Sequence, residues 1–224
     1  MASATADSVG RIRISALFES SLTAHGSGAH PYLGSDDLLR GPDAARNLAD
    51  AVHFLCTLHG RHPSVIDLAA ERTVDPAARA WLIAASEAFA AERQFLAALA
   101  VAAGPVPGTP GGSASEAAVV SQRGAIATLG RSERRGCALG AALGLAADWA
   151  RIRDVLDAAG RRLGVEPPPC ALSDLPAIQA VAEAAAVSPP PVERALLFGA
   201  EQILVQHHGL WALLEAREQA RRAC

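Results

Sequence analysis

The sequence predicts an all-α protein, a single-domain bundle of six or seven helices. Half of the 224 residues are hydrophobic, and Ala, the residue with the highest helix propensity, is the commonest of them. Apolar residues recur at helical spacing, and segments rich in Pro and Gly separate the periodic stretches. No alternating Val/Ile/Thr run and no Asn-Gly hairpin signal is present. We therefore expect residues 1–224 to form one helical domain.

The helix boundaries follow from caps and breakers. Asp75 followed by Pro76 is a strong helix start, because Asp caps the first turn and Pro fits its first position. Ser113 and Glu116 have the spacing of a capping box. The expected helices span about 8–24, 42–58, 75–103, 113–130 and 132–164, with a short helix from about 173 and a last one over 192–221.

Two segments interrupt this pattern. Residues 104–112 contain three Pro and lack any periodicity, so they are expected to form a loop joining two helices of the same domain. Residues 167–169 are three consecutive Pro and break the chain before the short helix. Neither segment suggests a boundary between domains.

Charge and hydropathy exclude several function classes. The net charge is −3 and no predicted helix carries a basic stripe, which argues against nucleic-acid binding. The longest charge-free apolar run, residues 137–147, is too short to span a bilayer, and the N-terminal residues are polar. The four cysteines form no CxxC pair and are expected to be free thiols. These features predict a soluble, cytoplasmic protein.

Three predicted helices place one ionisable residue on their apolar face. Glu92 lies on the seam formed by Phe89 and Leu96 in the longest helix. His207 occupies the corresponding position in the last helix, and His59 follows the apolar face of the helix after Pro42. The sequence therefore predicts that Glu92, His59 and His207 are buried.

A buried charge must be paired or ligated, since isolation in the core is costly. Imidazole and carboxylate groups suit a transition metal, a buried hydrogen-bond network, or acid–base chemistry. Glu201 and His208, on the flank of the last helix, could support such a site. The candidate ligand-binding residues are Glu92, His59, His207, Glu201 and His208, with His62, Asp148 and Arg123 as weaker candidates.

A purely structural interpretation stands beside this one. His59 lies near a helix end, where a cation is favourable and a His is ordinary. Glu92 could pair with an Arg from another helix, and His207 and His208 could be one core and one surface residue. No specific ligand, cofactor or metal is implied by either interpretation.

The helix expected over 132–164 contains GxxxG spacing at Gly136, Gly140 and Gly144, which in a soluble Ala-rich helix indicates close helix packing. Trp149 aligns with apolar positions and is expected in the core. Asp148 and Arg151 have the spacing of a surface ion pair. Nucleotide-binding loops, GxSxG and HExxH motifs are absent from the sequence.

Four stretches of the sequence are distinctive: residues 53–63 (HFLCTLHGRHP), 104–111 (GPVPGTPG), 136–140 (GCALG) and 148–149 (DW). Together they resemble an uncharacterised all-helical family of alphaproteobacterial proteins. The resemblance covers about residues 10–165 and implies an all-helical fold but no activity. Ferritin-like di-iron proteins are a weaker analogy, because their two Glu-x-x-His pairs are missing.

Two functional hypotheses follow. The first is a helical binding or interaction protein without catalytic activity, which could form a homo-oligomer. The second is a small-molecule or metal-binding enzyme or sensor that uses the buried Glu/His cluster. They differ in whether Glu92, His59 and His207 meet around a space that admits a ligand.

Overall fold

The fold consists of α-helices and confirms the all-α prediction. The computed structural model describes residues 2–186 and 190–223, with the backbone alone for residues 2–13. Within these residues it has nine α-helices, two 3₁₀ helices and no strand. They are α1 (Ala2–His25), η1 (Ser27–Ala29), η2 (Pro31–Gly34), α2 (Asp36–Leu39), α3 (Ala44–His59), α4 (Val65–Arg72), α5 (Pro76–Ala103), α6 (Gly112–Gly130), α7 (Cys137–Leu163), α8 (Leu175–Ala185) and α9 (Pro190–Arg222).

The short helices α2 and α4 were not predicted, because neither is long enough to show a helical period. α4 nevertheless has a complete capping box: Ser64 caps the backbone of Asp67, and the Asp67 carboxylate accepts from the Ser64 N–H at 2.7 Å. A third difference is the start of α7. It begins at Cys137 rather than near Ser132, since Gly136 adopts a φ of 94° that a helix does not allow.

The predicted caps form in part. The Asp75 carboxylate accepts from the Ala78 N–H at 2.8 Å, as expected for the start of α5. The capping box expected at Ser113 does not form, because α6 already begins at Gly112, with Gly111 in the left-handed conformation as its N-cap. Glycine supplies this start without a side-chain hydrogen bond.

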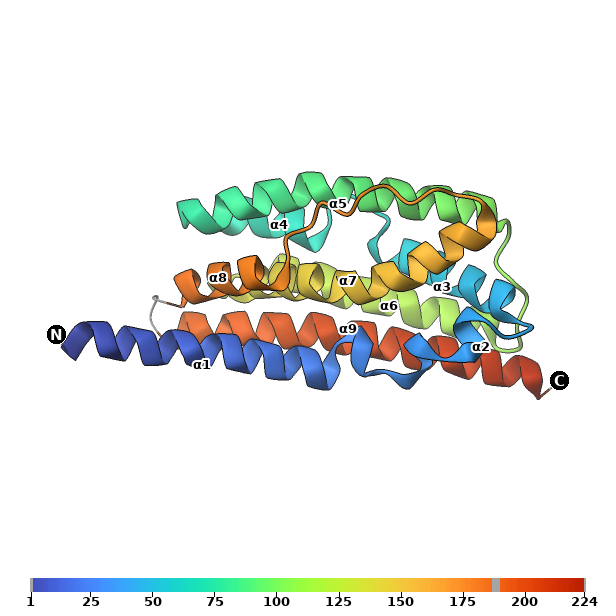
Figure 1. The fold of residues 1–224 in the computed structure, drawn as a ribbon, viewed down its shortest axis with the longest axis horizontal. Coiled ribbons are helices and arrows are strands. Elements are labelled where there is room, and N and C mark those ends of the chain that lie inside the picture. The colour runs from blue at the N-terminus through green and yellow to red at the C-terminus, as the bar shows by residue number, and fades with distance from the viewer. Residues whose placement is uncertain (1, 187–189, 224) are drawn as a thin grey trace.

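The long helices run roughly alongside one another (Figure 1). α7 lies between α5 and the α1–α9 pair, and its contact with α9 is the most extensive in the fold. A Cβ atom at Gly140 would lie 1.9 Å from the carbonyl oxygen of Leu196, and one at Gly199 would lie 2.1 Å from that of Cys137. Backbone therefore meets backbone here, which confirms the close packing predicted from the glycine spacing.

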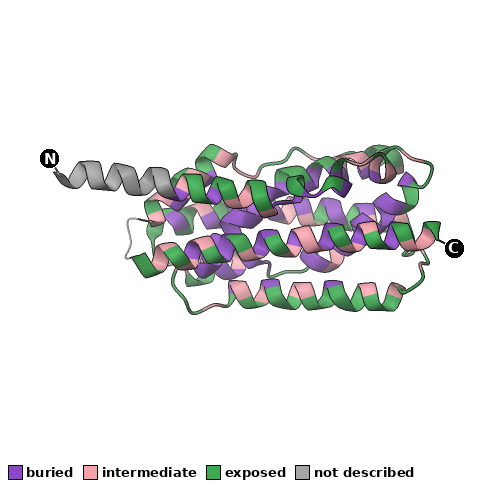
Figure 2. Cartoon of the chain, turned by 90° about the horizontal axis from the view of Figure 1, so that it is seen from below, coloured by how far each residue is buried: buried purple, intermediate pink, exposed green. Residues whose placement is uncertain are grey.

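Buried residues line the inward faces of the helices (Figure 2). Trp149 is fully buried, as predicted, and Cys137 is buried while Cys56 is half-buried. Cys56, Cys137 and Cys170 are free thiols. Among the described residues, no helix is both long and apolar enough to cross a membrane.

Candidate functional site

Glu92 of α5 is fully buried and has two partners on α7. One carboxylate oxygen accepts from the indole N–H of Trp149 at 2.9 Å, and the other lies 2.6 Å from Nη1 of Arg153. The Arg153 side chain is 8% exposed. Both carboxylate oxygens are thus paired, and the pairing with an Arg from another helix is the structural alternative that the sequence left open.

Arg153 connects this pair to the edge of the bundle. Its Nε lies 2.6 Å from the carboxylate of Asp157, one turn further along α7, and its Nη2 donates to the carbonyl oxygen of Pro168. Its guanidinium also lies 4.8 Å from the ring centre of Phe95. Arg153 therefore fastens the proline-rich segment after α7 to the core, while it balances the charge of Glu92.

His207 of α9 and His59 of α3 meet directly. Their Nε2 atoms are 2.9 Å apart, and the Nδ1 of His207 lies 2.7 Å from the carboxylate of Asp148 on α7. His207 is fully buried, His59 is 4% exposed and Asp148 is 1% exposed. A 2.9 Å contact between two imidazole nitrogens carries one proton, so one ring donates and the other accepts.

Asp148 is held by the chain just after α1. Its carboxylate accepts from the backbone N–H of Ser27 at 2.8 Å and from the Ser27 hydroxyl at 2.5 Å. A Cβ atom at Gly26 would lie 2.9 Å from the same carboxylate, so glycine permits this approach. The expected surface pair of Asp148 with Arg151 is wrong: Asp148 is buried, and Arg151 lies 3.8 Å from Asp154 instead.

The environment keeps His59 neutral. Burial, and then the neighbouring His207, lower the pKa of His59 well below its ordinary value of 6.5. Its ring packs edge-on against Trp149, with the ring centres 5.6 Å apart. A neutral imidazole in this position can accept or donate a hydrogen bond but does not add a charge to the core.

Trp149 joins the two halves of the cluster. Its N–H bonds Glu92, while its ring contacts His59 and Phe89, the latter with ring centres 4.8 Å apart. Among the described residues, no hydrogen bond or ion pair directly links Glu92 to His59 or His207. The three predicted residues are thus brought into one region of the core, and the indole separates the carboxylate from the imidazoles.

The other candidates lie outside this cluster. Glu201 is exposed, with its carboxylate 3.8 Å from the ring of His25. His208 packs its ring against His30, with ring centres 4.8 Å apart. His62 contacts Asp67 at 3.2 Å on the surface. Arg123, on α6, is half-buried.

The described residues contain no group of three or more His, Cys, Asp or Glu side chains arranged to hold a metal ion. In the buried cluster, Arg153 occupies one side of Glu92 and Trp149 the other. The chemistry that this arrangement supports is hydrogen bonding and charge balance within the core.

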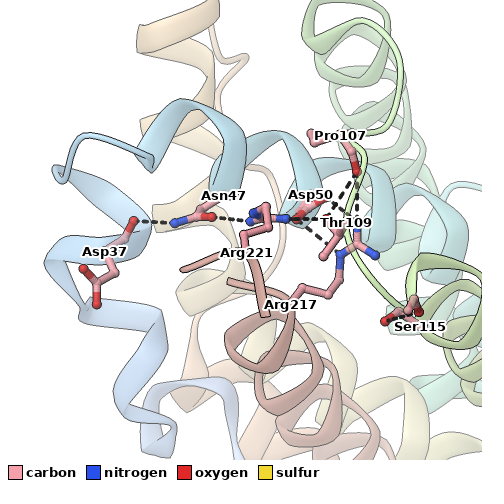
Figure 3. A network of polar contacts seen from close by, with 9 residues as sticks. Asp37, Asn47, Asp50, Pro107, Thr109, Ser115, Arg217 and Arg221 are labelled. Atoms are coloured by element: carbon pink, nitrogen blue, oxygen red, sulfur yellow. Dashed lines mark hydrogen bonds and ion pairs between the residues drawn. The ribbon is translucent and has the colours of Figure 1, made fainter. Parts of the chain in front are cut away.

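A second polar cluster ties the end of α9 to α3 and to the loop 104–111 (Figure 3). Asp50 is 1% exposed and accepts from Arg217 at 2.9 and 3.2 Å, and it also pairs with Arg221. Arg217 and Arg221 then donate to the carbonyl oxygen of Pro107 and the hydroxyl of Thr109, at 3.2 and 2.7 Å. The loop is therefore anchored by two arginines of α9.

Several residues of these clusters were not predicted from the sequence. Ser27 lies in a short 3₁₀ helix without a periodic pattern. Asp50 and Arg153 fall on helix faces whose burial depends on which helices pack there. A signal was available for Asp50, because Phe54 follows it by four residues on the same face of the helix, but an Asp alone there is equally typical of a surface.

Comparison with known proteins places this chain in a family. The model of a family of unknown function, DUF6975, matches residues 22–222. No curated protein and no solved structure matches the chain. The match contains α2 to α9 and every residue of the two polar clusters described above. The chain therefore belongs to the DUF6975 family, a family of unknown function.

Proposed function

We propose that this chain is a helical binding protein without catalytic activity, in which Glu92, His59 and His207 stabilise the core. One observation carries the proposal: the polar atoms of Glu92 and His207 are paired with other groups of the core. Both oxygens of Glu92 and both ring nitrogens of His207 have partners within the protein. Because each of these atoms already has a partner within the protein, the arrangement favours a structural role over contact with a substrate.

The same cluster has the form of a structural network rather than of a site. Its side chains come from α3, α5, α7 and α9, so that each hydrogen bond fixes one helix against another. A fully satisfied polar network in a core favours one arrangement of the helices over alternatives. Binding would then take place on the surface of the bundle.

A second candidate function rests on the alignment of Asp148, His207 and His59. A carboxylate that orients an imidazole, which in turn contacts another titratable group, is an arrangement used for proton transfer. An enzyme or sensor that opened the bundle to a small molecule or metal could use it. If this second candidate is right, a small molecule or metal should bind in contact with His59.

Elemental analysis and thermal unfolding in the presence of a small-molecule library distinguish the two candidates. A binding protein with a structural cluster should carry no stoichiometric metal, and ligands that raise its melting temperature should do so equally in wild type and in His59→Gln, measured as a shift from each protein's own midpoint. A stoichiometric metal, or a ligand shift lost in His59→Gln, would support the second candidate instead. Glu87→Gln, an exposed change on α5, serves as the control.

The proposal extends to location and partners. The free thiols Cys56, Cys137 and Cys170 suit a reducing compartment, which favours the cytoplasm. The Ala-rich helices and the scarcity of large exposed side chains on α6 favour a second copy of the chain as a partner. Size-exclusion chromatography with light scattering tests the oligomeric state directly.

A further inference from the structure

A pocket of about 580 Å³ lies where the α6–α7 loop meets the first turns of α9. Arg134 and Arg135 reach it from the loop, and Arg194 reaches it from α9. All three arginines are exposed. Because α7 begins at Cys137 and not near Ser132, the preceding residues form a non-helical loop, and this loop carries Arg134 and Arg135 to the pocket.

The three positive charges are not balanced within the pocket. Among the described residues, no carboxylate lies within 4.0 Å of these guanidinium groups, and no acidic residue lines the pocket. Glu133 and Asp75 line the adjoining cleft, which shares Arg134, Arg135 and Val192 with the pocket. The lining charge is therefore +3, from three Arg and no acid.

A second arginine-lined cleft on the molecule provides a contrast. It lies between α2 and α7, and Arg40, Arg161 and Arg162 line it together with Asp154 and Asp157. Three Arg and two Asp give a lining charge of +1. Of these two clefts, the pocket at α9 has the higher lining charge and no acid among its described lining residues, and such a concentration attracts anions.

The remaining wall of the pocket is apolar. Val192, Ala195 and Phe198 of α9 line it, and Phe198 is 43% exposed. The other described phenylalanines, at positions 18, 54, 89 and 95, are at most 3% exposed. An aromatic ring left accessible next to three arginines offers contact to a ligand that is part anion and part apolar.

We infer that this pocket binds a small organic oxyanion, a phosphate or carboxylate that carries an apolar group. The guanidinium groups bind the oxyanion through paired hydrogen bonds, for which their planar geometry is suited. Phe198 and Val192 contact the apolar group. The inference rests on the proposed function, since it names the ligand class of a binding protein.

Isothermal titration with phenyl phosphate, inorganic phosphate and phenol tests the inference on the full chain. Phenyl phosphate should bind more tightly than inorganic phosphate, and phenol should not bind. Arg194→Gln should weaken phenyl phosphate binding by about tenfold, the effect of one charge-assisted hydrogen bond. Phe198→Ala should reduce the preference for phenyl phosphate over inorganic phosphate and leave inorganic phosphate binding unchanged.

Arg46→Gln is the matched control, because Arg46 is an exposed arginine of α3 that lines none of the three clefts described above. It should not alter binding of phenyl phosphate. Equal weakening by Arg46→Gln and Arg194→Gln would overturn the inference, as would the absence of phenyl phosphate binding to wild type. Binding to phosphatidylglycerol vesicles without binding of phenyl phosphate would overturn it in favour of a lipid surface.

The outcomes also separate this inference from the proposed function. If phenyl phosphate fails to bind while the cluster variants behave as structural, only the pocket assignment fails. If phenyl phosphate binds but is lost in His59→Gln and retained in Arg194→Gln, the ligand lies in the core and both proposals fail. Release of phosphate from bound phenyl phosphate would support the assignment of the pocket as the binding site and contradict the non-catalytic function.

Discussion

The Nδ1 of His207 lies 2.7 Å from the carboxylate of Asp148, and this contact fixes the orientation of the imidazole in the core. The carboxylate accepts, so the Nδ1 of His207 carries a proton and its Nε2 faces His59. Since Ser27 supplies two further hydrogen bonds to Asp148, two other segments of the chain converge on this carboxylate.

Replacement of Glu92 should destabilise the protein, and Leu should destabilise it more than Gln. Glu92→Gln removes the charge opposite Arg153 and should lower the free energy of unfolding by about 1–3 kcal/mol. Glu92→Leu also leaves the Trp149 N–H without its acceptor and should cost about 3–5 kcal/mol, the range for one partner removed from a buried ion pair. Urea unfolding, with m-values compared, measures both. The exposed Glu87→Leu should change stability by less than about 0.5 kcal/mol, and a neutral or stabilising Glu92→Leu would contradict a structural role.

Stability should fall as the pH drops below 6.5, because the pKa of His59 is lowered by burial and by His207. The unfolded chain binds a proton on this imidazole near its ordinary pKa, whereas the folded chain does so only at lower pH. The contribution of His59 is therefore fully present above pH 6.5 and is lost as the pH falls, by up to about 1.4 kcal/mol per pH unit. Urea unfolding of wild type and His59→Gln between neutral and mildly acidic pH should give a smaller slope for the variant. Equal slopes would show that His59 does not resist protonation in the folded state.

Substitution of the packed glycines should force α7 and α9 apart. At Gly140 an added methyl would collide with the backbone of Leu196, so Gly140→Ala should cost about 1–3 kcal/mol or more. Gly124→Ala on α6 is the control: a Cβ there meets nothing within 4 Å, and helix propensity predicts a gain of up to about 1 kcal/mol. Thermal unfolding, monitored by circular dichroism, should give the highest melting temperature for G124A, an intermediate one for wild type and the lowest for G140A. A Gly140→Ala variant as stable as wild type would mean that the helices separate easily.

Removal of the Asp50 charge should release the loop 104–111. Asp50→Asn leaves Arg217 and Arg221 without their common carboxylate, and the same arginines hold Pro107 and Thr109. Hydrogen–deuterium exchange of the loop should therefore become faster, while the amides of α7 keep their protection. Asp154→Asn, an exposed change on α7, should leave the loop unaffected. Unchanged exchange in Asp50→Asn would show that the loop is held by other contacts.

How far the sequence predicts this molecule can be judged from single residues. Glu92 and Trp149 were predicted to be buried because each continues the apolar period of a long helix, a property local to that helix. Arg153 was not predicted, because its burial depends on the crossing of α5 and α7. Asp148 was placed on the surface for a related reason: its spacing to Arg151 suits a surface pair, and only the fold shows that Ser27 and His207 face it. Local periodicity thus indicates which residues enter the core, whereas their partners follow from tertiary packing.

The glycine contact between α7 and α9 has a consequence for the polar core. Asp148 lies eight residues after Gly140, and His207 lies eight residues after Gly199. The two helices run in the same direction, since Gly140 meets Leu196, Gly144 meets Ala200 and Asp148 meets His207 in turn. With about 1.5 Å of rise per residue, the backbone contact therefore sits about 12 Å along the helices from the hydrogen bond. Where the two backbones touch, a shift of one helix along the other is resisted. The glycines therefore fix the register of α7 and α9, and this register places a carboxylate and an imidazole within hydrogen-bond distance two turns away.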